Sequence, residues 1–444
     1  MTVRGPRPLP RAPGDGAGAW DRERTVGVLY DAGSADAPEV AAAARYSGVD
    51  LFLVVDRASD HVRELLPVLT RRFALCDITG LAAPAAAAAV AAFAPDGLLT
   101  FSAHRMEITA AIAAALDLPY WHSPAVTARL VDRLQQRRTF AEAGLDDLPF
   151  APVTGAADVD AALAAVGLPA VLKPSRGPAH RLVRRVDSVA DARAAVAAWS
   201  AAAPDAGLLV EALLPGDPAA AGPRWGDYVS VETAVHREEC QQLCVTGKFP
   251  LVEPLRQRGS FVPHTLAPPL AERAESLAEA AIGALGISDG IVHTKLKLTA
   301  DGPRLLGVDG RLGGHVGDVV RRGSGFDPVA AAMRLALGLP VPDPPRFDGV
   351  TYRYALLTPA GPPRRPGGPP LTDVRALAAR LDHLRHLPGV DLADLPADAA
   401  RAPEPRFGAG ARVGHLQGRT ADHVELARLA VSVDEICRPV LGAP

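Results

Sequence analysis

The first 130 residues alternate short apolar runs with longer segments rich in Ala and Leu. Short runs rich in β-branched residues are typical of buried strands, and the segments between them have the length of helices. Four strands are expected, at Thr25 to Tyr30, Leu51 to Val55, Phe73 to Ile78 and Leu98 to Phe101. The segment Ala82 to Ala94 is interpreted as a covering helix, because alanine is the best helix former. This alternation predicts a small parallel sheet with right-handed crossovers.

A second unit with a different pattern begins near Asp146. Its expected elements are a strand at Ala170 to Pro174, a strand near Leu182 to Val186, a helix from Val189, a strand that starts at Leu208, strands near Tyr228 to Val235 and Gln242 to Gly247, and a helix at Leu270 to Leu285. Two further strands, Val292 to Leu298 and Arg304 to Val308, are joined by a turn that ends at Gly302, which predicts a hairpin.

These patterns predict a mixed α/β and α+β protein of several units. The predicted parts are a disordered leader at 1–24, an N-terminal α/β domain at 25–130, a central unit at 131–340 and a small C-terminal αβ domain at 341–444, with a mobile loop at 359–370.

Composition excludes several classes of partner. The formal net charge of -3 provides no long-range field for a phosphate backbone or an anionic membrane, so nucleic acid and membranes are not expected partners. No apolar run approaches 18 residues without a charge. The four cysteines show no CxxC spacing and the N-terminal segment has no apolar core of a signal peptide, so we expect a reduced, cytoplasmic protein.

Lysine is rare in this chain. The sequence has no Asn, and Lys173, Lys248, Lys295 and Lys297 are its only lysines among 47 basic residues. Lys173 ends an apolar strand and precedes a loop with Gly177, a geometry that can place an ammonium and backbone N–H groups against phosphates. A solvated lysine at a strand end is the alternative. Glu211 ends the next apolar strand, where a carboxylate is either a site residue or simply exposed.

The most specific constellation spans Gly286 to Gly314 and ends in Arg311-Leu-Gly-Gly314. The order Lys173, Glu211, Lys248, hairpin and Arg311-Leu-Gly-Gly resembles the ATP-grasp superfamily, and within it the amino-acid and dipeptide ligases of the carboxylate-amine type. The segments around Lys248 and Arg258 to His264, and the pattern Ala411-Arg-Val-Gly-His415, are similar to the same branch. The resemblance implies a Rossmann-like N-terminal domain, a two-lobed ATP-grasp clamp and a small C-terminal domain.

The resemblance also implies an activity and a set of site residues. Such enzymes phosphorylate a carboxylate with ATP and let an amine displace the phosphate. The expected nucleotide-binding residues are Arg133, Lys173, Glu211, Leu213, Lys248 and Lys295. Arg311 and Lys248 are the expected catalytic residues, and Arg311 and Gly314 would hold the substrate carboxylate and the phosphoryl oxygens. Glu107 and His264 stand where relatives line the amino-acid pocket, but each is equally consistent with an ordinary surface residue.

The hairpin departs from the family pattern, which has Glu, Glu and Asn as ligands of Mg²⁺. Here those positions are Lys295, Gly307 and Asp309. Only Asp309 can still bind a metal, and an ammonium at a ligand position repels Mg²⁺ while it mimics its charge. ATP is therefore the expected cofactor, and Mg²⁺ is a doubtful one.

Two hypotheses follow. The first is an ATP-dependent carboxylate-amine ligase that makes a dipeptide or amino-acid amide from small amino-acid substrates, in specialised metabolism. The second is a catalytically degenerate relative that binds a ligand or a partner subunit. A zinc site at His383 and His386 lacks further ligands, and no GxSxG elbow indicates a hydrolase. The oligomeric state stays open, with a homodimer as one option.

Overall fold

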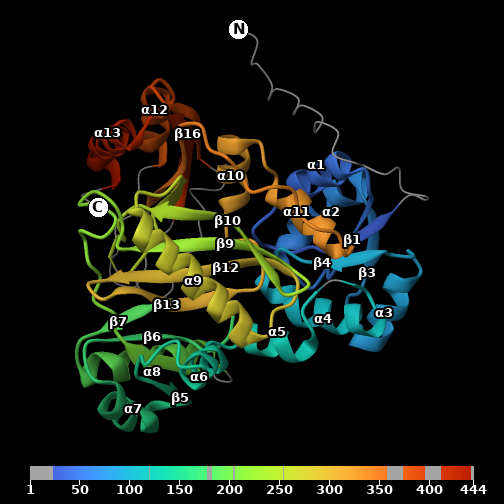
Figure 1. Ribbon diagram of the computed structural model, residues 1–444, viewed down its shortest axis with the longest axis horizontal. Helices are drawn as coiled ribbons and strands as arrows, with labels where there is room; N and C mark the ends of the chain where they lie inside the picture. Colours follow the sequence, from blue (N-terminus) through green and yellow to red (C-terminus); the bar gives the residue numbers. More distant parts are fainter. Residues whose placement is uncertain are drawn as a thin grey trace.

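The computed structural model describes residues 24–119, 121–177, 183–203, 206–253, 255–357, 374–395 and 412–441. Residues 1–23 of the predicted leader, the predicted loop 359–370, and residues 178–182, which follow Gly177 and include the first residue of the predicted strand Leu182 to Val186, lie outside the described residues. Three sheets organise the described part of the chain, one of four parallel strands, one of four antiparallel strands and one of eight strands (Figure 1).

The first sheet has the order β3-β2-β1-β4 and is parallel throughout. Its elements are β1 (Thr25–Leu29), α1 (Ala37–Ser47), β2 (Asp50–Val55), α2 (Asp60–Arg72), β3 (Ala74–Asp77), α3 (Ala83–Ala91), β4 (Gly97–Leu99), a 3₁₀ turn (Ala103–Arg105) and α4 (Met106–Ala115). Helix α1 begins at a capping box of Asp36 and Glu39 and ends at Gly48, which has φ 65°. The four predicted strands and the predicted covering helix are confirmed within two or three residues at their ends.

The second sheet forms a small lobe with the order β5-β8-β6-β7. The chain enters it through α5 (Pro124–Val131) and α6 (Arg133–Glu142). The lobe consists of β5 (Phe150–Val153), a 3₁₀ turn (Ala156–Asp158), α7 (Val159–Val166), β6 (Ala170–Pro174), β7 (Arg184–Val186), α8 (Val189–Ala202) and β8 (Leu208–Ala212). Helices α7 and α8 bury Leu163, Val196 and Trp199 against β6 and β8, which gives the lobe its own core.

The third sheet has the order β13-β12-β9-β10-β11-β14-β16-β15. Its strands are β9 (Tyr228–His236), β10 (Glu239–Lys248), β11 (Gly259–Val262), β12 (Gly290–Thr299), β13 (Gly302–Asp309), β14 (Val350–Leu357), β15 (Val390–Asp394) and β16 (Arg412–Thr420). The accompanying helices are α9 (Pro268–Leu285), α10 (Val316–Ser324), α11 (Pro328–Ala336), α12 (Val374–Arg385) and α13 (His423–Leu441). The predicted hairpin is confirmed as β12 and β13.

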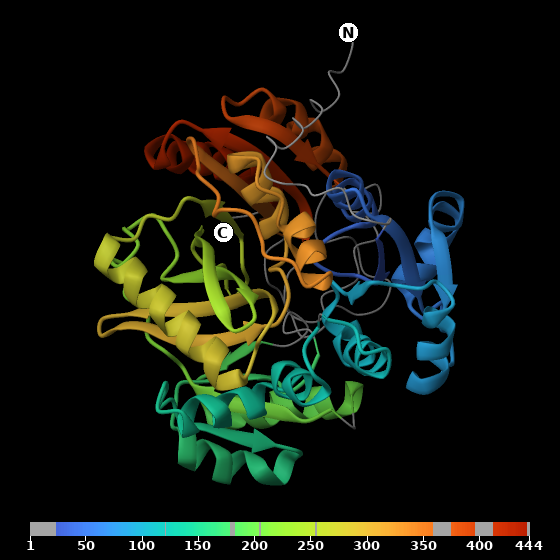
Figure 2. The ribbon, with the colours of Figure 1, turned by 45° about the vertical axis from the view of Figure 1, so that its right-hand side comes forward.

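Helix α9 determines which face of this sheet is apolar. It lies across β9, β10, β12 and β13 (Figures 1 and 2) and packs its buried alanines against Val231, Val245 and Val292. Because successive side chains of a strand point to opposite faces, Ser230, Glu232 and Thr246 point away from α9. We call this opposite side of the eight-stranded sheet the polar face.

Contacts cross two of the domain boundaries that the sequence predicted, the one between residues 130 and 131 and the one between residues 340 and 341. Strand β14 pairs with β11, and β16 and β15 follow it, so the C-terminal strands extend the central sheet. Phe249 and Phe261 share one apolar cluster with Tyr352 and Leu416. Helix α11 packs on the first sheet, where a Cβ at Gly97 would lie 2.1 Å from the Ala336 carbonyl oxygen. Among the described residues, no helix is long and apolar enough to cross a membrane.

Candidate functional site

One row of paired residues crosses four strands on the polar face. Lys248 of β10 pairs with Ser260 of β11, Ser260 with Arg353 of β14, and Arg353 with Gln417 of β16. Directly paired residues of neighbouring strands point to the same side of a sheet. The row therefore connects a lysine of the central strands with an arginine of the C-terminal strands on one continuous surface.

A second group on the same face surrounds the β12–β13 hairpin. Lys295 pairs with Ser230 of β9 on one side and with Gly307 of β13 on the other, and His293 pairs with Glu232 and Asp309 in the same way. Ser230 in turn pairs with Thr246, two residues before Lys248. The hairpin residues and Lys248 thus belong to one site.

The predicted metal position is occupied by an ion pair. Lys295 Nζ lies 2.9 Å from Asp309 Oδ2, and Arg311 Nη2 lies 3.8 Å from the same oxygen. Burial opposes ionisation of Asp309, but the charges of Lys295 and Arg311 outweigh it and hold the pKa of this carboxyl far below its usual range. Asp309 is therefore a carboxylate that two cations already neutralise.

Glu232 is the second carboxylate on this face, and it is 1% exposed. Its Oε1 contacts His293 Nδ1 and accepts a hydrogen bond of 3.2 Å from the Ser230 hydroxyl, whereas Oε2 has no partner among the described residues. The loop after β13 passes over His293 so closely that a Cβ at Gly313 would lie 2.3 Å from Nδ1. Glycine is therefore needed at 313, and Glu232 and His293 form a shielded pair.

These residues do not fit Mg²⁺. The ion requires near-octahedral oxygen ligation, usually through one or two carboxylates that are free to bind it together with substrate phosphates. Asp309 faces two cations, Glu232 is bound to His293, and the described residues contain no group of three His, Cys, Asp or Glu side chains that could hold a metal ion.

Lys248 has a different environment. It is 7% exposed, and its ammonium makes no hydrogen bond or ion pair with any described residue. Burial lowers its pKa to about 8, and Glu232 only partly opposes this shift. A buried cation without a paired anion is costly, so this position is complementary to an anion that comes from outside the chain.

Lys173 of the small lobe is buried, which excludes the solvated alternative. Its ammonium binds Glu211 Oε1 across the paired strands β6 and β8. Arg137 of α6 donates to Glu211 Oε2 at 2.8 Å, to Asp146 Oδ2 at 2.8 Å and to the Leu305 carbonyl oxygen at 2.9 Å. Arg137 therefore links the small lobe to strand β13 of the large sheet.

Arg133 lies at the edge of the same lobe. Its guanidinium donates to the carbonyl oxygens of Pro174 (2.7 Å) and Gly177 (2.8 Å), which are in the segment that follows Lys173. Burial lowers its pKa, while the charges of Asp309 and Glu211 oppose the shift. Carboxylates of both lobes, Glu211 and Asp309, thus act on Arg133.

The structure places the other predicted residues less centrally. The Leu213 N–H donates to the Pro169 carbonyl oxygen, and Glu107 is an exposed partner of Arg176 at 3.1 Å. His264 Nδ1 accepts a hydrogen bond from the Leu266 N–H, and among the described residues it makes no polar contact with Lys248 or Arg311. Gly314 is exposed next to His315, which begins α10 with φ 62°.

Sequence reasoning missed a basic cluster at the far end of the polar face. Arg412 Nη1 lies 2.8 Å from His315 Nε2, and Arg353 donates no hydrogen bond to a described residue. Burial and the charge of Arg412 lower the pKa of Arg353 to about 10, and burial together with both arginines lowers the pKa of His315 to about 3 and that of His415 to about 4. The pattern Ala411-Arg-Val-Gly-His415 contains two members of this cluster, Arg412 and His415, whereas Arg353 and His315 were not predicted.

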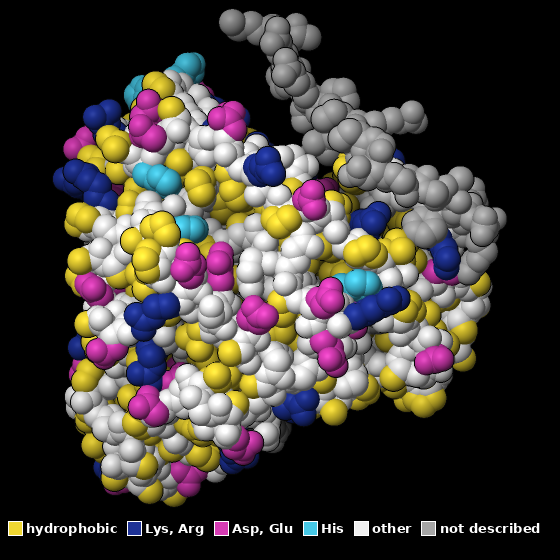
Figure 3. Space-filling view, in the orientation of Figure 1, with side chains coloured by type: hydrophobic (Ala, Val, Ile, Leu, Met, Phe, Trp, Pro, Cys, Tyr) yellow, Lys and Arg dark blue, Asp and Glu magenta, His cyan; other side chains and the backbone are white. Residues whose placement is uncertain are grey.

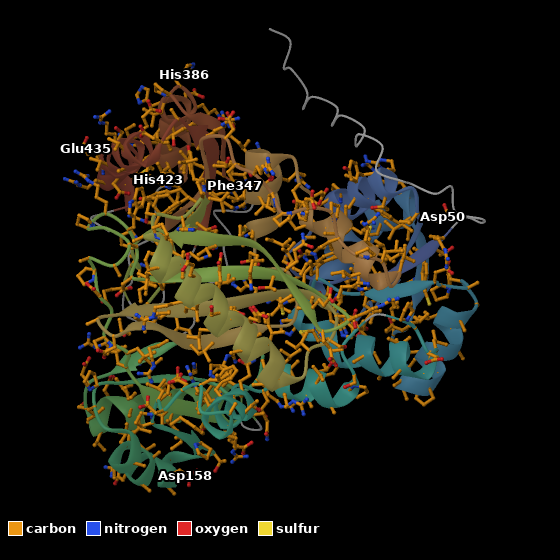
Figure 4. The ribbon with its side chains drawn as sticks, in the orientation of Figure 1. Asp50, Asp158, Phe347, His386, His423 and Glu435 are labelled. Atoms are coloured by element: carbon orange, nitrogen blue, oxygen red, sulfur yellow. The ribbon has the colours of Figure 1, made fainter. Side chains whose placement is uncertain are left out.

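His383 and His386 stay outside this region, since His386 lies at the outer end of the C-terminal part (Figure 4). On the face of the molecule that Figure 3 shows, basic and acidic side chains are interspersed, and no extended basic patch appears there.

Comparison with known proteins gives a structural likeness only. No protein-family model matches the sequence, and no curated protein does. The chain is similar to the structure of L-amino acid ligase from Bacillus licheniformis, with TM-score 0.71 and 19% identity over 94% of this chain and 98% of that chain. An N5-carboxyaminoimidazole synthase from Aspergillus clavatus in complex with ADP gives TM-score 0.67 and 16% identity over 93% and 99%. A biotin carboxylase from Campylobacter jejuni gives 0.63 and 15% over 93% and 91%.

Proposed function

We propose that this chain, which has the ATP-grasp fold, is an ATP-dependent ligase that joins the carboxylate of an amino acid to an amine. The observation that carries the proposal is the buried Lys248 ammonium, which forms no ion pair with a described residue and shares the polar face with Lys295 and Arg311. Three cations against Asp309 and Glu232 leave an excess positive charge, which suits a polyphosphate.

The residues of the small lobe suit the same ligand. Lys173 and Arg133 lie at the end of β6, next to the segment that was predicted to cradle phosphates. In the proposed complex Lys173 leaves Glu211 for a phosphate oxygen, and Arg137 keeps Glu211 neutralised. This exchange keeps every buried charge compensated, which favours binding.

The substrate end of the site is assigned to the basic cluster. Arg353 and Arg412 present guanidinium groups that match a planar carboxylate, while His315 and His415 stay neutral at physiological pH because of their lowered pKa values. A free carboxylate of an amino-acid substrate would relieve the repulsion between the two arginines. Anionic substrates are therefore favoured over neutral or cationic ones.

In the proposed reaction the reacting carboxylate takes the γ-phosphoryl group of ATP, which gives an acyl phosphate and ADP. The amine then attacks the acyl carbon, a C–N bond forms, inorganic phosphate leaves and the amine loses a proton. Arg311 and Lys248 would stabilise the negative charge that develops on the transferring oxygens. Chemistry of this kind requires no redox partner.

One observation favours the second candidate, a nucleotide-binding protein without turnover. The Lys295–Asp309 ion pair stands where the resemblance predicts metal ligands, and Lys173 is held by Glu211. Such a protein would bind ATP but would not consume it.

The test is an incubation of the purified chain with ATP and pools of amino acids. We expect release of ADP and phosphate that depends on the pool, and a product whose mass is the sum of two components minus water. Lys173→Met should abolish ADP release, and Arg353→Met should raise the KM of the acidic or carboxylate-bearing substrate. ATP binding without ADP release in any pool would instead support the second candidate.

A further inference from the structure

We propose that the nucleotide phosphates bind to this chain without a divalent metal ion, because the ammonium of Lys295 supplies the positive charge at the hairpin. The inference rests on the proposed function, since it concerns the nucleotide of that same site. It adds that the nucleotide binds through its phosphates alone, without a metal cofactor.

The position of the ammonium is defined by strand pairing and by an ion pair. Lys295 stands between Ser230 and Gly307 in the sheet, so its side chain points to the polar face. Its Nζ is 2.9 Å from Asp309, and the two side chains remain 30% and 28% exposed. The ammonium is thus fixed by Asp309 and still accessible to a ligand.

Charge arithmetic disfavours a metal at this point. A divalent ion beside Asp309 would meet Lys295 at ion-pair distance and Arg311 within 3.8 Å of the same oxygen. Like charges at such distances repel strongly in a partly buried site. Phosphate oxygens, in contrast, are attracted by both the Lys295 ammonium and the Arg311 guanidinium.

The backbone of β13 also disfavours a carboxylate ligand at position 307. The register between β12 and β13 shifts after Lys295, and Gly307 has φ 153°, a conformation that side-chain-bearing residues rarely adopt. Gln136 holds the shifted strand through its side chain, with hydrogen bonds of 2.9 Å from the Val308 N–H and 2.8 Å to the Val308 carbonyl oxygen. A carboxylate at 307 would therefore require a different strand geometry, and not only a different side chain.

Isothermal titration of the full chain with ATP, once with Mg²⁺ and once with EDTA, tests the inference. We expect the two dissociation constants to agree within about threefold, and Lys295→Met to weaken binding in EDTA by about tenfold or more, the size of one lost charged contact. Lys297→Met is the matched control, because Lys297 lies two residues further on the same strand and pairs with Asp227 at 2.7 Å. This control should change the ATP affinity less than about twofold.

A second variant, Lys295→Glu, reverses the charge and places two carboxylates side by side. We expect this protein to lose ATP binding in EDTA and to regain it with Mg²⁺. In the absence of nucleotide, we also expect its melting temperature to depend on Mg²⁺. If the unmodified chain binds ATP only with Mg²⁺, or if Lys295→Met binds ATP as tightly as the unmodified chain, the inference is wrong while the proposed function stands. If ATP binds under neither condition, both are wrong.

Discussion

Lys173 and Glu211 are diagonal neighbours on two adjacent strands of the small lobe and form a buried ion pair. Arg137 binds the other oxygen of the same carboxylate. Burial would raise the pKa of Glu211, but the charges of Arg137 and Lys173 outweigh it and lower the pKa to about 2. One buried carboxylate therefore compensates the charges of two buried cations, Arg137 and Lys173.

We expect Glu211→Gln to destabilise the chain more than Lys173→Met. The first change leaves two buried cations with only Asp146 near Arg137, and an uncompensated buried charge costs about 3 to 5 kcal/mol. The second change leaves Glu211 paired with Arg137, so we expect a smaller decrease in the free energy of unfolding. Urea unfolding of both variants measures this difference. An equal or larger decrease for Lys173→Met would contradict the assignment of Glu211 as the centre of this network.

ATP affinity should depend on pH. Burial lowers the pKa values of Lys173 and Lys248 to about 8, and the carboxylates Glu211 and Glu232 oppose the shifts only in part. Since protonated amines bind phosphate, affinity should decrease as the pH rises from about 7 through about 8 to 9.5. Removal of one titrating group in Lys248→Met should make the decrease shallower. A flat profile for the unmodified chain would show that neither ammonium contacts the ligand.

Arg311→Lys should impair turnover although it preserves the charge. Arg311 contacts Asp309 and donates at 2.9 Å to the Leu312 carbonyl oxygen, and lysine cannot reproduce the planar fork that binds an oxyanion at two points. We expect kcat to fall by about tenfold or more with little change in the melting temperature. Unchanged steady-state kinetics would show that the guanidinium only supports the loop.

Gly313→Ala should disturb the Glu232–His293 pair, because its Cβ would lie 2.3 Å from His293 Nδ1. Forcing a methyl group into such a packed position costs about 1 to 3 kcal/mol. Gly314→Ala is the control, since its Cβ would meet no atom within 4 Å. Denaturant unfolding of the two variants should separate them, and equal stability would argue against close packing of this loop on His293.

The sequence was informative where signals are local. Apolar runs predicted β1 to β4, and the turn before Gly302 predicted the β12–β13 hairpin, because strand and turn preferences act over a few residues. The sequence does not specify that Lys173 is buried, because a lysine at a strand end is compatible with solvent or with a site. Its partner Glu211 is 38 residues away, and no pattern in the sequence pairs them.

The residues that sequence reasoning missed depend on distant pairing. Arg137 belongs to a helix with Arg133 and Arg138, and nothing local distinguishes it, yet it connects Glu211 with Leu305. Arg353 reaches the row of Lys248 only because β14 pairs with β11 across about 100 residues of chain. The register of the sheet, which a single sequence does not specify, therefore decides the composition of the polar face.

The strand order of the eight-stranded sheet also constrains its biosynthesis. A ribosome releases β9 to β13 first, and until β14 emerges the backbone groups of β11 form an unpaired edge. Strand β15 is made before β16, which is its only pairing partner among the described strands, so β15 must wait until β16 has been made. The sheet is therefore complete only after nearly all of the polypeptide has been translated. A nascent chain that stalls before β14 presents the unpaired edge of β11 to other chains.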